Sequence, residues 1–179
     1  DLTPGLIKVL KTWDVCSKEW IVRQYDHEVQ GGSVAKPLQG VGSGPGDAAV
    51  WNPLPLHGPA ATIISHGINV RYGAIDPYWM AAAVIDEALR GIIAAGGSLK
   101  QVAILDNFCL GSPENTQILG SLVRMARACY DMATVYRTPF ISGKDSFYNQ
   151  FQLRGETIAV PPTLLILSLI HISEPTRPY

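Results

Sequence analysis

Two short polar segments hold residue types that bind phosphorylated ligands. Asp106 closes one apolar run of the sequence, and Gly143-Lys144-Asp145-Ser146 closes another. Polar groups beside glycine at the carboxyl ends of strands are typical of ligand sites in α/β sheets. Glycine lets a phosphate approach the backbone, lysine supplies positive charge, and a carboxylate with a hydroxyl can hold Mg²⁺. The segment is not a Walker-type loop, because no glycine stands five positions before Gly143, so a polar turn is the alternative.

Two further constellations could bind a polar ligand. Asp47 follows a glycine-rich tract and Glu87 lies within a predicted helix, so the two carboxylates could hold a cation together. The alternatives are a turn residue at position 47 and a solvent-facing acid at position 87. Residues 66–73 contain His, Asn, Arg and Tyr, which predicts a loop able to bind a phosphorylated substrate. A histidine after a strand is more often simply hydrogen-bonded, and we assign His66 no proton transfer.

The elements that must position these groups alternate along the chain. Strands are predicted near residues 47–50, 62–65, 101–105 and 140–141, with a strand pair within 152–166. A helix is predicted over residues 78–95, capped by Asp76, and another over residues 116–136. Their apolar stripes are Ala81, Ile85, Ala88, Leu89 and Ile92 on the first, and Leu119, Leu122, Ala126, Cys129 and Ala133 on the second. Short helices are predicted after Thr3-Pro4 and over residues 18–25. This order indicates an α/β or α+β domain with helices on one face of its sheet.

Composition narrows the function classes. Of the 179 residues 47% are hydrophobic and 16% charged, with 14 Lys and Arg against 15 Asp and Glu. A net charge of −1 excludes a nucleic-acid binder that depends on a basic face, and the apolar content excludes a disordered chain. The longest apolar run, residues 163–172, is too short to cross a membrane. The low charge and the start at Asp1 lead us to expect a fragment of a longer protein.

The three cysteines predict no metal site and no nucleophile. Cys16, Cys109 and Cys129 are widely spaced and form no CxxC pair, which is typical of reduced thiols in a cytosolic protein. Cys109 does not lie in a strand-to-helix elbow, and no Ser/His/Asp arrangement is supported. We therefore assign no catalytic residue.

Six segments together resemble one family, the phosphoribosylformylglycinamidine (FGAM) synthases of purine biosynthesis. They are Tyr25-Asp26-His27-Glu28-Val29-Gln30, Gly46-Asp47-Ala48-Ala49-Val50, Asn69-Val70-Arg71-Tyr72, Ala103-Ile104-Leu105-Asp106-Asn107-Phe108, Gly111-Ser112-Pro113-Glu114 and Gly143-Lys144-Asp145-Ser146. The resemblance runs in order over residues 6–166. The synthetase part of this family has two halves, each like aminoimidazole ribonucleotide (AIR) synthase, and the matching segments resemble the second half.

The resemblance implies a domain organisation. Residues 1–32 resemble linking helices, and residues 33–166 resemble the N-terminal subdomain of the second half, an AIR synthase-like mixed sheet with helices packed on one face. The other sheet face is then expected to be apolar, because it pairs with a matching subdomain in this superfamily. Residues 167–179 resemble the translation of a sequencing adapter, and we expect a read-through tail on the surface or at a sheet edge. A genuine divergent strand is the alternative.

The resemblance also implies a reaction. The family uses ATP to activate formylglycinamide ribonucleotide (FGAR), and ammonia from glutamine then displaces phosphate to give the amidine. The implied partners are FGAR, a first synthetase half and a glutaminase unit that nothing in this chain resembles. No nucleic acid or membrane is expected, and the location is expected to be cytoplasmic. The isolated 179-residue chain is expected to be an inactive part of an ATP-dependent C–N ligase.

Site residues follow from the same resemblance. Asp106, Gly143 and Lys144 match nucleotide-binding positions, and Ser146 matches a substrate-contacting serine. Lys144 stands where the shorter family members have a metal-binding Asn, so the sequence is more similar to the long single-chain forms here.

In those long forms an auxiliary ADP or ATP is held through Mg²⁺. The ligands of that Mg²⁺ resemble Asp47, Glu87 and Asp145. A further Asn ligand of those forms is replaced by Gly91 in this sequence.

Other functions within the superfamily are the alternatives. AIR synthase, selenophosphate synthetase and thiamine phosphate kinase all activate an oxygen with ATP on a similar subdomain, but the linking helices and the motif at residues 25–30 argue against them. A different class is a non-catalytic nucleotide-binding scaffold, in which this half only stabilises the enzyme.

Overall fold

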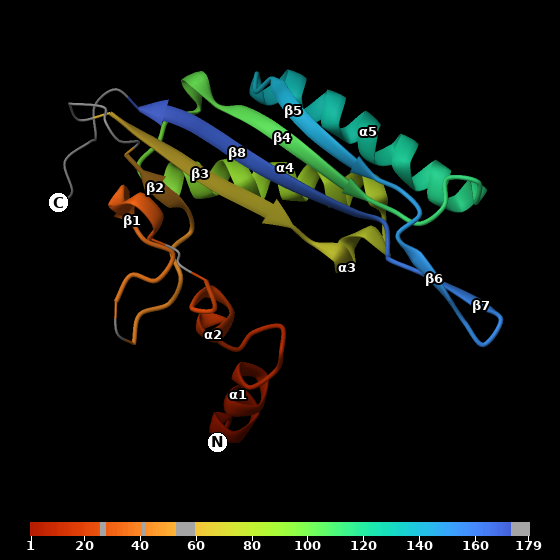
Figure 1. Cartoon of the computed structure of the whole chain (residues 1–179), viewed down its shortest axis with the longest axis horizontal. Coiled ribbons are helices and arrows are strands. Elements are labelled where there is room, and N and C mark those ends of the chain that lie inside the picture. Colours follow the sequence, from red (N-terminus) through yellow and green to blue (C-terminus); the bar gives the residue numbers. More distant parts are fainter. Residues whose placement is uncertain (26–27, 41, 53–59, 173–179) are drawn as a thin grey trace.

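The chain folds around one six-stranded sheet with two long helices on one face (Figure 1). A computed structural model describes residues 1–25, 28–40, 42–52 and 60–172. The strand order is β1-β2-β3-β8-β4-β5, and only the β4–β5 pair is parallel. The strands are β1 (Ser33–Ala35), β2 (Ala49–Trp51), β3 (Ala61–Ile68), β4 (Ala103–Cys109), β5 (Phe140–Ser146) and β8 (Thr163–Ile172). The predicted α/β class with helices on one face is therefore confirmed.

The two long helices begin and end where the sequence predicts. Helix α4 (Pro77–Ala94) is capped by Asp76, whose Oδ1 accepts hydrogen bonds from the backbone N–H groups of Tyr78 and Trp79. Helix α5 (Thr116–Tyr136) is capped in the same way by Asn115. These caps satisfy backbone donors that the first helical turn leaves without partners, which fixes both starting points.

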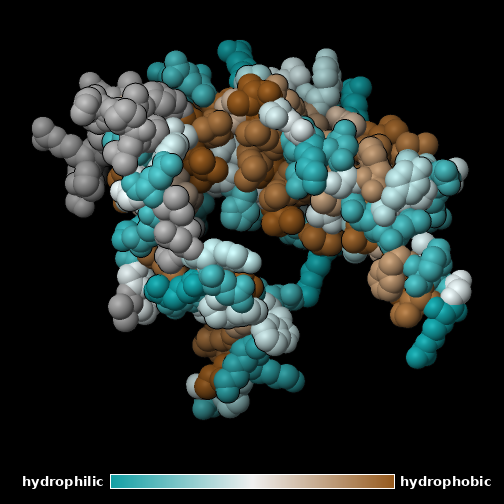
Figure 2. All heavy atoms as spheres, viewed as in Figure 1, coloured by the Kyte–Doolittle hydropathy of each residue, from teal (hydrophilic) through white to brown (hydrophobic). Residues whose placement is uncertain are grey.

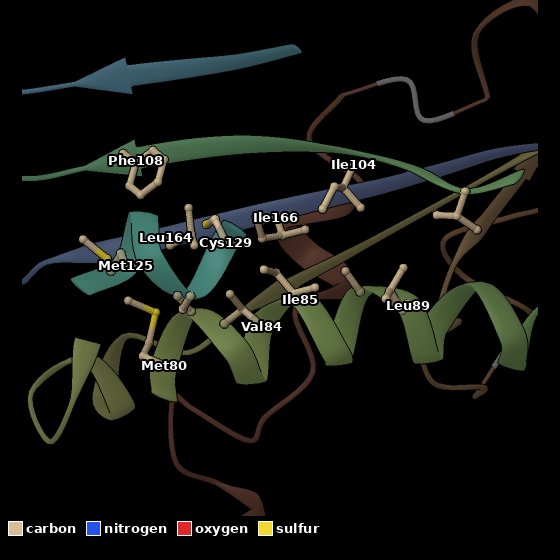
Figure 3. Close-up of a cluster of buried hydrophobic side chains, with 14 of the residues drawn as sticks. Met80, Val84, Ile85, Leu89, Ile104, Phe108, Met125, Cys129, Leu164 and Ile166 are labelled. Atoms are coloured by element: carbon tan, nitrogen blue, oxygen red, sulfur yellow. The ribbon is translucent and has the colours of Figure 1, made fainter. Parts of the chain in front are cut away.

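The core lies between this helix layer and the sheet (Figure 3). All five predicted stripe residues of α4 are buried, with at most 2% exposure. The stripe predicted for α5 is only partly right: Cys129 is buried, but Leu119 is 44% exposed. The buried line of α5 is instead Met125, Ala128 and Cys129, because this helix contacts α4 along a narrow strip. Gly67 lets α4 approach β3 closely, since a Cβ there would lie 2.0 Å from the carbonyl oxygen of Val84.

The remaining elements are short. They are α1 (Thr3–Leu10), α2 (Glu19–Val22), η1 (Val29–Gly31), α3 (Val70–Gly73), η2 (Leu99–Gln101), and a hairpin of β6 (Gln150–Leu153) and β7 (Glu156–Ala159). The helix predicted over residues 18–25 shrinks to α2, and α1 has no buried residue. Figure 1 shows α1 and α2 apart from the sheet. Residues 26–27 of the first family motif lie outside the described residues. Within the described residues, no helix is both long enough and apolar enough to cross a membrane.

Three strands are longer than predicted, and this moves candidate residues into the sheet. Strand β4 continues to Cys109 and β5 to Ser146, so Asp106 and residues 143–146 lie within strands rather than after them. Strand β3 continues to Ile68, so His66 is a strand residue and not part of a loop. Polar residues can extend these strands because neighbouring strands supply the backbone hydrogen bonds regardless of side-chain type.

The second half of β8 contradicts the expected place of residues 167–172. Residues 167–172 pair with β3, and residues 167–169 also pair with β4 on the other side, so they extend a central strand, not an edge strand. Leu164, Ile166, Ser168 and Ile170 alternate inward without a break, and Ser168 is fully buried. Its hydroxyl donates to the carbonyl oxygen of Ala88 at 2.8 Å. The read-through origin of residues 167–179 stays a prediction, and residues 173–179 lie outside the described part of the chain.

The sheet side away from α4 and α5, here called the open face, is largely apolar. Register and side-chain alternation place Ile64 and Ile68 of β3, Leu165, Leu167 and Leu169 of β8, and Leu105 of β4 on it. Ile64, Ile68 and Leu167 are 39%, 43% and 37% exposed. Apolar side chains spread over the sheet in Figure 2. The expectation of an apolar opposite face is confirmed at the centre of the sheet, whereas Asn107, Lys144 and Ser146 make its β4–β5 side polar.

Candidate functional site

The predicted site residues gather at two places, the β4–β5 strand pair and a cavity beside α4. At the first place, Asp106 of β4 is the direct partner of Gly143 of β5. A Cβ at position 143 would lie 2.3 Å from Asp106 Oδ1 and 2.6 Å from Oδ2. The Asp106 carboxylate thus lies over Gly143, and only glycine leaves room for it there.

The segment from Gly143 to Ser146 divides between the two sides of the sheet. Asp145 pairs with Phe108, a core residue, so it shares the helix-facing side with Asp106. Lys144 and Ser146 pair with Asn107 and Cys109 and lie on the open face. The sequence motif therefore presents a carboxylate on one side of β5 and an ammonium with a hydroxyl on the other.

The electrostatics of the strand pair favour a positive partner for its carboxylates. Burial raises the pKa of Asp106 above its ordinary value, and the negative charge of Asp145 raises it further. Burial also raises the pKa of the Cys129 thiol to about 12, with a smaller contribution from Asp106. Cys129 is consequently a protonated core side chain, which agrees with the assignment of no cysteine nucleophile.

The second place is a cavity of about 600 Å³ at the outer edge of β3. Its lining comprises Gly46, Asp47, Ser65, His66, Asn69, Tyr72, Ala83, Asp86, Glu87, Arg90, Gly91 and Ala94. The carboxylate pair and the polar segment at residues 66–73 thus line one cavity. From the sequence they are two separate groups of candidate residues. Arg71 of that segment does not line it and instead pairs with Asp14. Asn69 accepts a hydrogen bond from the backbone N–H of Tyr72 and so caps α3.

Glu87 and Asp47 are held differently in this cavity. Glu87 is exposed, as the alternative predicts, but its Oε2 accepts the backbone N–H of Ile68 at 3.0 Å. One carboxylate oxygen of Glu87 is therefore engaged with the end of β3. Asp47 is fixed through its backbone, because its carbonyl oxygen accepts the Ser65 hydroxyl at 3.0 Å.

Position 91 leaves no room for the Asn ligand of the long family forms. A Cβ at Gly91 would lie 1.9 Å from Ser65 Oγ and 2.9 Å from the carbonyl oxygen of Asp47. The Ser65–Asp47 hydrogen bond occupies the space that a larger residue would need. The glycine is thus a packing requirement of this fold as well as a lost ligand.

A hydrogen-bonded trio beside Glu87 was not anticipated from the sequence. Arg90 Nε donates to Asp86 Oδ2 at 2.5 Å, and the Tyr136 hydroxyl donates to Asp86 Oδ1 at 2.8 Å. These contacts hold the pKa of Asp86 below its ordinary value, chiefly through Arg90. The spacing of Asp86 and Arg90, four residues apart on a helix, was the available signal. The part of Tyr136 depends on how α4 and α5 pack and leaves no such signal.

The three predicted metal ligands do not meet. Asp47 and Glu87 line the cavity, whereas Asp145 lies on β5, separated from β3 by β8 and β4. Across the described residues, no group of three or more His, Cys, Asp or Glu side chains is placed to hold a metal ion. Mg²⁺ is commonly bound by one or two carboxylates, with water and phosphate oxygens completing the shell. Asp47 and Glu87 fit that smaller requirement.

Comparison with known proteins points to one family. The family described as AIR synthase related protein, N-terminal domain, matches residues 45–162. The phosphoribosylformylglycinamidine synthase subunit PurL of Methanocaldococcus jannaschii is 33% identical over 174 residues, which are 97% of this chain and 22% of that protein. The subunit of the same name from Ignicoccus hospitalis is 38% identical over 166 residues, or 93% and 22%. The chain thus spans about 22% of the length of these curated relatives.

Solved structures show the same fold. The structure of PurLQS from Thermotoga maritima matches with a TM-score of 0.70 at 23% identity, over 88% of this chain and 24% of that one. T. maritima PurL complexed with ADP also matches with a TM-score of 0.70, at 22% identity, over 91% and 25%. At this level of identity, the likeness is evidence for the fold alone.

Proposed function

This chain belongs to the AIR synthase related protein family, and we propose that it is part of an FGAM synthase of purine biosynthesis. In this proposal residues 33–166 are the N-terminal subdomain of the second synthetase half, and residues 1–32 link it to the preceding half. The observation that carries the proposal is the Asp106 carboxylate lying over Gly143, with Lys144 next along the same strand on the opposite side of the sheet. The similarity to the PurL subunits supports it.

The proposed reaction is ATP-dependent C–N bond formation. The terminal phosphate of ATP is transferred to the formyl amide oxygen of FGAR, which turns that oxygen into a leaving group. Ammonia then adds to the activated carbon, and inorganic phosphate departs to leave the amidine. Phosphoryl transfer of this kind is catalysed mainly by positioning and by charge stabilisation, so binding groups are what the chain must supply.

The binding groups have distinct proposed roles. Asp106 and Gly143 contact the nucleotide from the helix-facing side of β5, and Lys144 contacts it from the open face. Ser146 contacts the substrate from the open face, where Lys144 also lies. The substrate at Ser146 and the nucleotide at Lys144 would therefore meet on the same side of β5.

Magnesium has its best place at the cavity. Asp47 and Glu87 would hold Mg²⁺, and the ion would supply charge neutralisation for a di- or triphosphate. Asp145, which the family resemblance assigns to the same ion, is better placed to act beside Asp106.

The apolar open face supports the proposed partners. Exposed Ile64 and Ile68 would be covered by the matching subdomain of a first synthetase half. A separate glutaminase unit would deliver ammonia. Because these partners complete the site, we propose that the isolated chain does not form the amidine.

Two measurements test the proposal. The purified 179-residue chain is expected to show no FGAR-dependent ATP hydrolysis, and detectable hydrolysis would overturn the proposed inactivity. In the full-length parent protein, Asp106→Asn and Gly143→Ala are expected to weaken ADP–Mg²⁺ binding in calorimetric titrations. Gly44→Ala is the control, because nothing lies within 4 Å of the position its Cβ would take. Unchanged binding in both site variants would contradict the nucleotide assignment.

A non-catalytic scaffold is the second candidate, and the joint place of Asp47 and Glu87 in the cavity favours it. In the long family forms that this sequence resembles, the corresponding carboxylates hold an auxiliary nucleotide. Asp145→Ala in the parent protein separates the two functions. Lost nucleotide retention with intact turnover would favour the scaffold, whereas lost turnover with an intact fold would favour catalysis.

A further inference from the structure

The cavity beside α4 has an uneven charge distribution. Asp47, Asp86 and Glu87 line it, and among its described lining residues Arg90 is the one lysine or arginine. An anion would be repelled by the carboxylates unless a cation or a fixed guanidinium offered it a place. The position of Arg90 therefore decides whether this cavity can accept a phosphate.

Arg90, whose side chain is 76% exposed, is held through Asp86, which contacts residues of both long helices. Its Nε donates to Asp86 Oδ2 at 2.5 Å along α4, and Tyr136 of α5 donates to the other oxygen of Asp86 at 2.8 Å. Asp86 is thus fixed at both oxygens and cannot follow Arg90 away from the cavity. The printed contacts of the described residues engage only Nε of Arg90, so its terminal nitrogens remain available to a ligand.

We propose that Arg90 is the phosphate-binding residue of this cavity, and that Asp86 and Tyr136 are positioning residues that aim its guanidinium. The planar guanidinium can bind two oxygens of one phosphate, which lysine cannot reproduce. With Asp47 and Glu87 beside it, the cavity would take a phosphoanhydride as its Mg²⁺ complex rather than a free anion. This inference rests on the proposed function and adds the residue that would bind the phosphate, together with the two residues that position it.

A second trio in the same helix pair provides a matched comparison. Arg127 Nε donates to Asp131 Oδ2 at 3.1 Å, and the Tyr78 hydroxyl donates to the same oxygen at 3.0 Å. Its i,i+4 spacing and tyrosine partner are those of the Arg90 trio, but neither Arg127 nor Asp131 lines the cavity. If Arg90 had a purely structural role, Arg90→Lys and Arg127→Lys would change the affinity for the ligand equally.

The test uses inorganic pyrophosphate as the probe, with and without Mg²⁺, on the ¹⁵N-labelled 179-residue chain. The side-chain Nε–H signal of Arg90, identified by its absence in Arg90→Lys, is expected to shift on titration with pyrophosphate and Mg²⁺. Arg90→Lys is expected to weaken binding about tenfold, and Tyr136→Phe about threefold, as expected for the loss of one charge-assisted and one ordinary hydrogen bond. Arg127→Lys, the control, should leave the affinity within about twofold.

The outcomes separate this inference from the proposed function. No shift of the Arg90 signal, or equal weakening in Arg90→Lys and Arg127→Lys, overturns the inference. A shift with Mg²⁺–pyrophosphate but no tighter binding of ADP supports Arg90 and counts against the nucleotide assignment of the chain. If ADP binding is weakened by Asp106→Asn but not by Arg90→Lys, the proposed function is supported and the role of Arg90 is contradicted.

Discussion

The two parts of the candidate site shift the pKa values of their carboxylates in opposite directions. On the β4–β5 pair, burial and the charge of Asp145 raise the pKa of Asp106. In the cavity, Arg90 and Tyr136 lower the pKa of Asp86. The first carboxylate lacks a fixed counter-charge among the groups that shift it, whereas the second is part of a completed network. The strand pair therefore carries negative charge that no neighbouring positive group of the described residues offsets, whereas the carboxylate of Asp86 in the cavity is already paired.

The largest expected effect tests how tightly the cavity is assembled. Gly91→Asn forces a side chain into Ser65 and the Asp47 carbonyl, so we expect a loss of about 3 kcal/mol in the free energy of unfolding. Urea denaturation measures it. The control is Gly120→Asn in the second turn of α5, where nothing lies within 4 Å of a new Cβ and little change is expected. Equal losses in both variants would show that the cavity wall is looser than described.

The next effect tests the strand pair. Gly143→Ala would push the Asp106 carboxylate away, because the new Cβ would lie 2.3 Å from its Oδ1. We expect about 1–3 kcal/mol of destabilisation, typical of an overpacked site. Gly44→Ala again serves as the control in the same denaturation experiment. A neutral Gly143→Ala would mean that Asp106 has another rotamer of equal energy.

A smaller expected effect is the pH dependence of stability that the raised pKa of Asp106 produces on the strand pair. Because the folded-state pKa of Asp106 is raised, its contribution to stability is present below the unfolded pKa near 3.8 and is lost as pH rises through the folded value. Asp145→Asn removes the repelling charge and should bring the pKa of Asp106 closer to its ordinary value. Carboxyl ¹³C NMR titration of Asp106 measures the shift. If the pKa of Asp106 did not change in Asp145→Asn, burial would be the sole cause of its raised value.

The smallest expected effect concerns Asp76, for which the pH dependence of stability has the opposite sign. Arg124 donates to Asp76 Oδ1 and Oδ2 at 2.7 and 2.6 Å and holds the pKa of Asp76 below its ordinary value. Its contribution is present above the unfolded pKa near 3.8 and is lost as pH falls through the folded value. Arg124→Gln should therefore lower the thermal midpoint at pH 6 slightly more than at pH 3. A difference of the reverse sign would contradict the assignment.

The sequence predicts best those features that depend on neighbours in the chain. Asp76 and Asn115 act as caps within their own helices, and the bounds of α4 and α5 follow from them. Asp106 and Gly143 could be singled out because each follows apolar strand residues. Their position inside the strands could not, because strand length here depends on pairing with β8 and on the register between β4 and β5.

The cavity was the least predictable part of the site. Its lining comes from the segment before β2, from β3, from the start of α3 and from α4, and Asp86 is fixed by Tyr136 of α5. Asp47 and Glu87 were recognised as candidates, but sequence spacing carries no information on which carboxylates converge across elements. Asp145 is an example. The family resemblance assigns it to the same Mg²⁺ ion as Asp47 and Glu87, but two strands separate it from the cavity.

The central position of β8 has a consequence for how the protein folds. Strands β3 and β4 are not paired with each other, and both await a strand that comes after every other described strand in the chain. Ala61 pairs with Ile172, so the sheet closes through contacts between residues far apart in sequence. Such topology favours slow folding, in which β2–β3 and β4–α5–β5 form first as separate units. During synthesis, the two halves would remain unjoined until β8 leaves the ribosome.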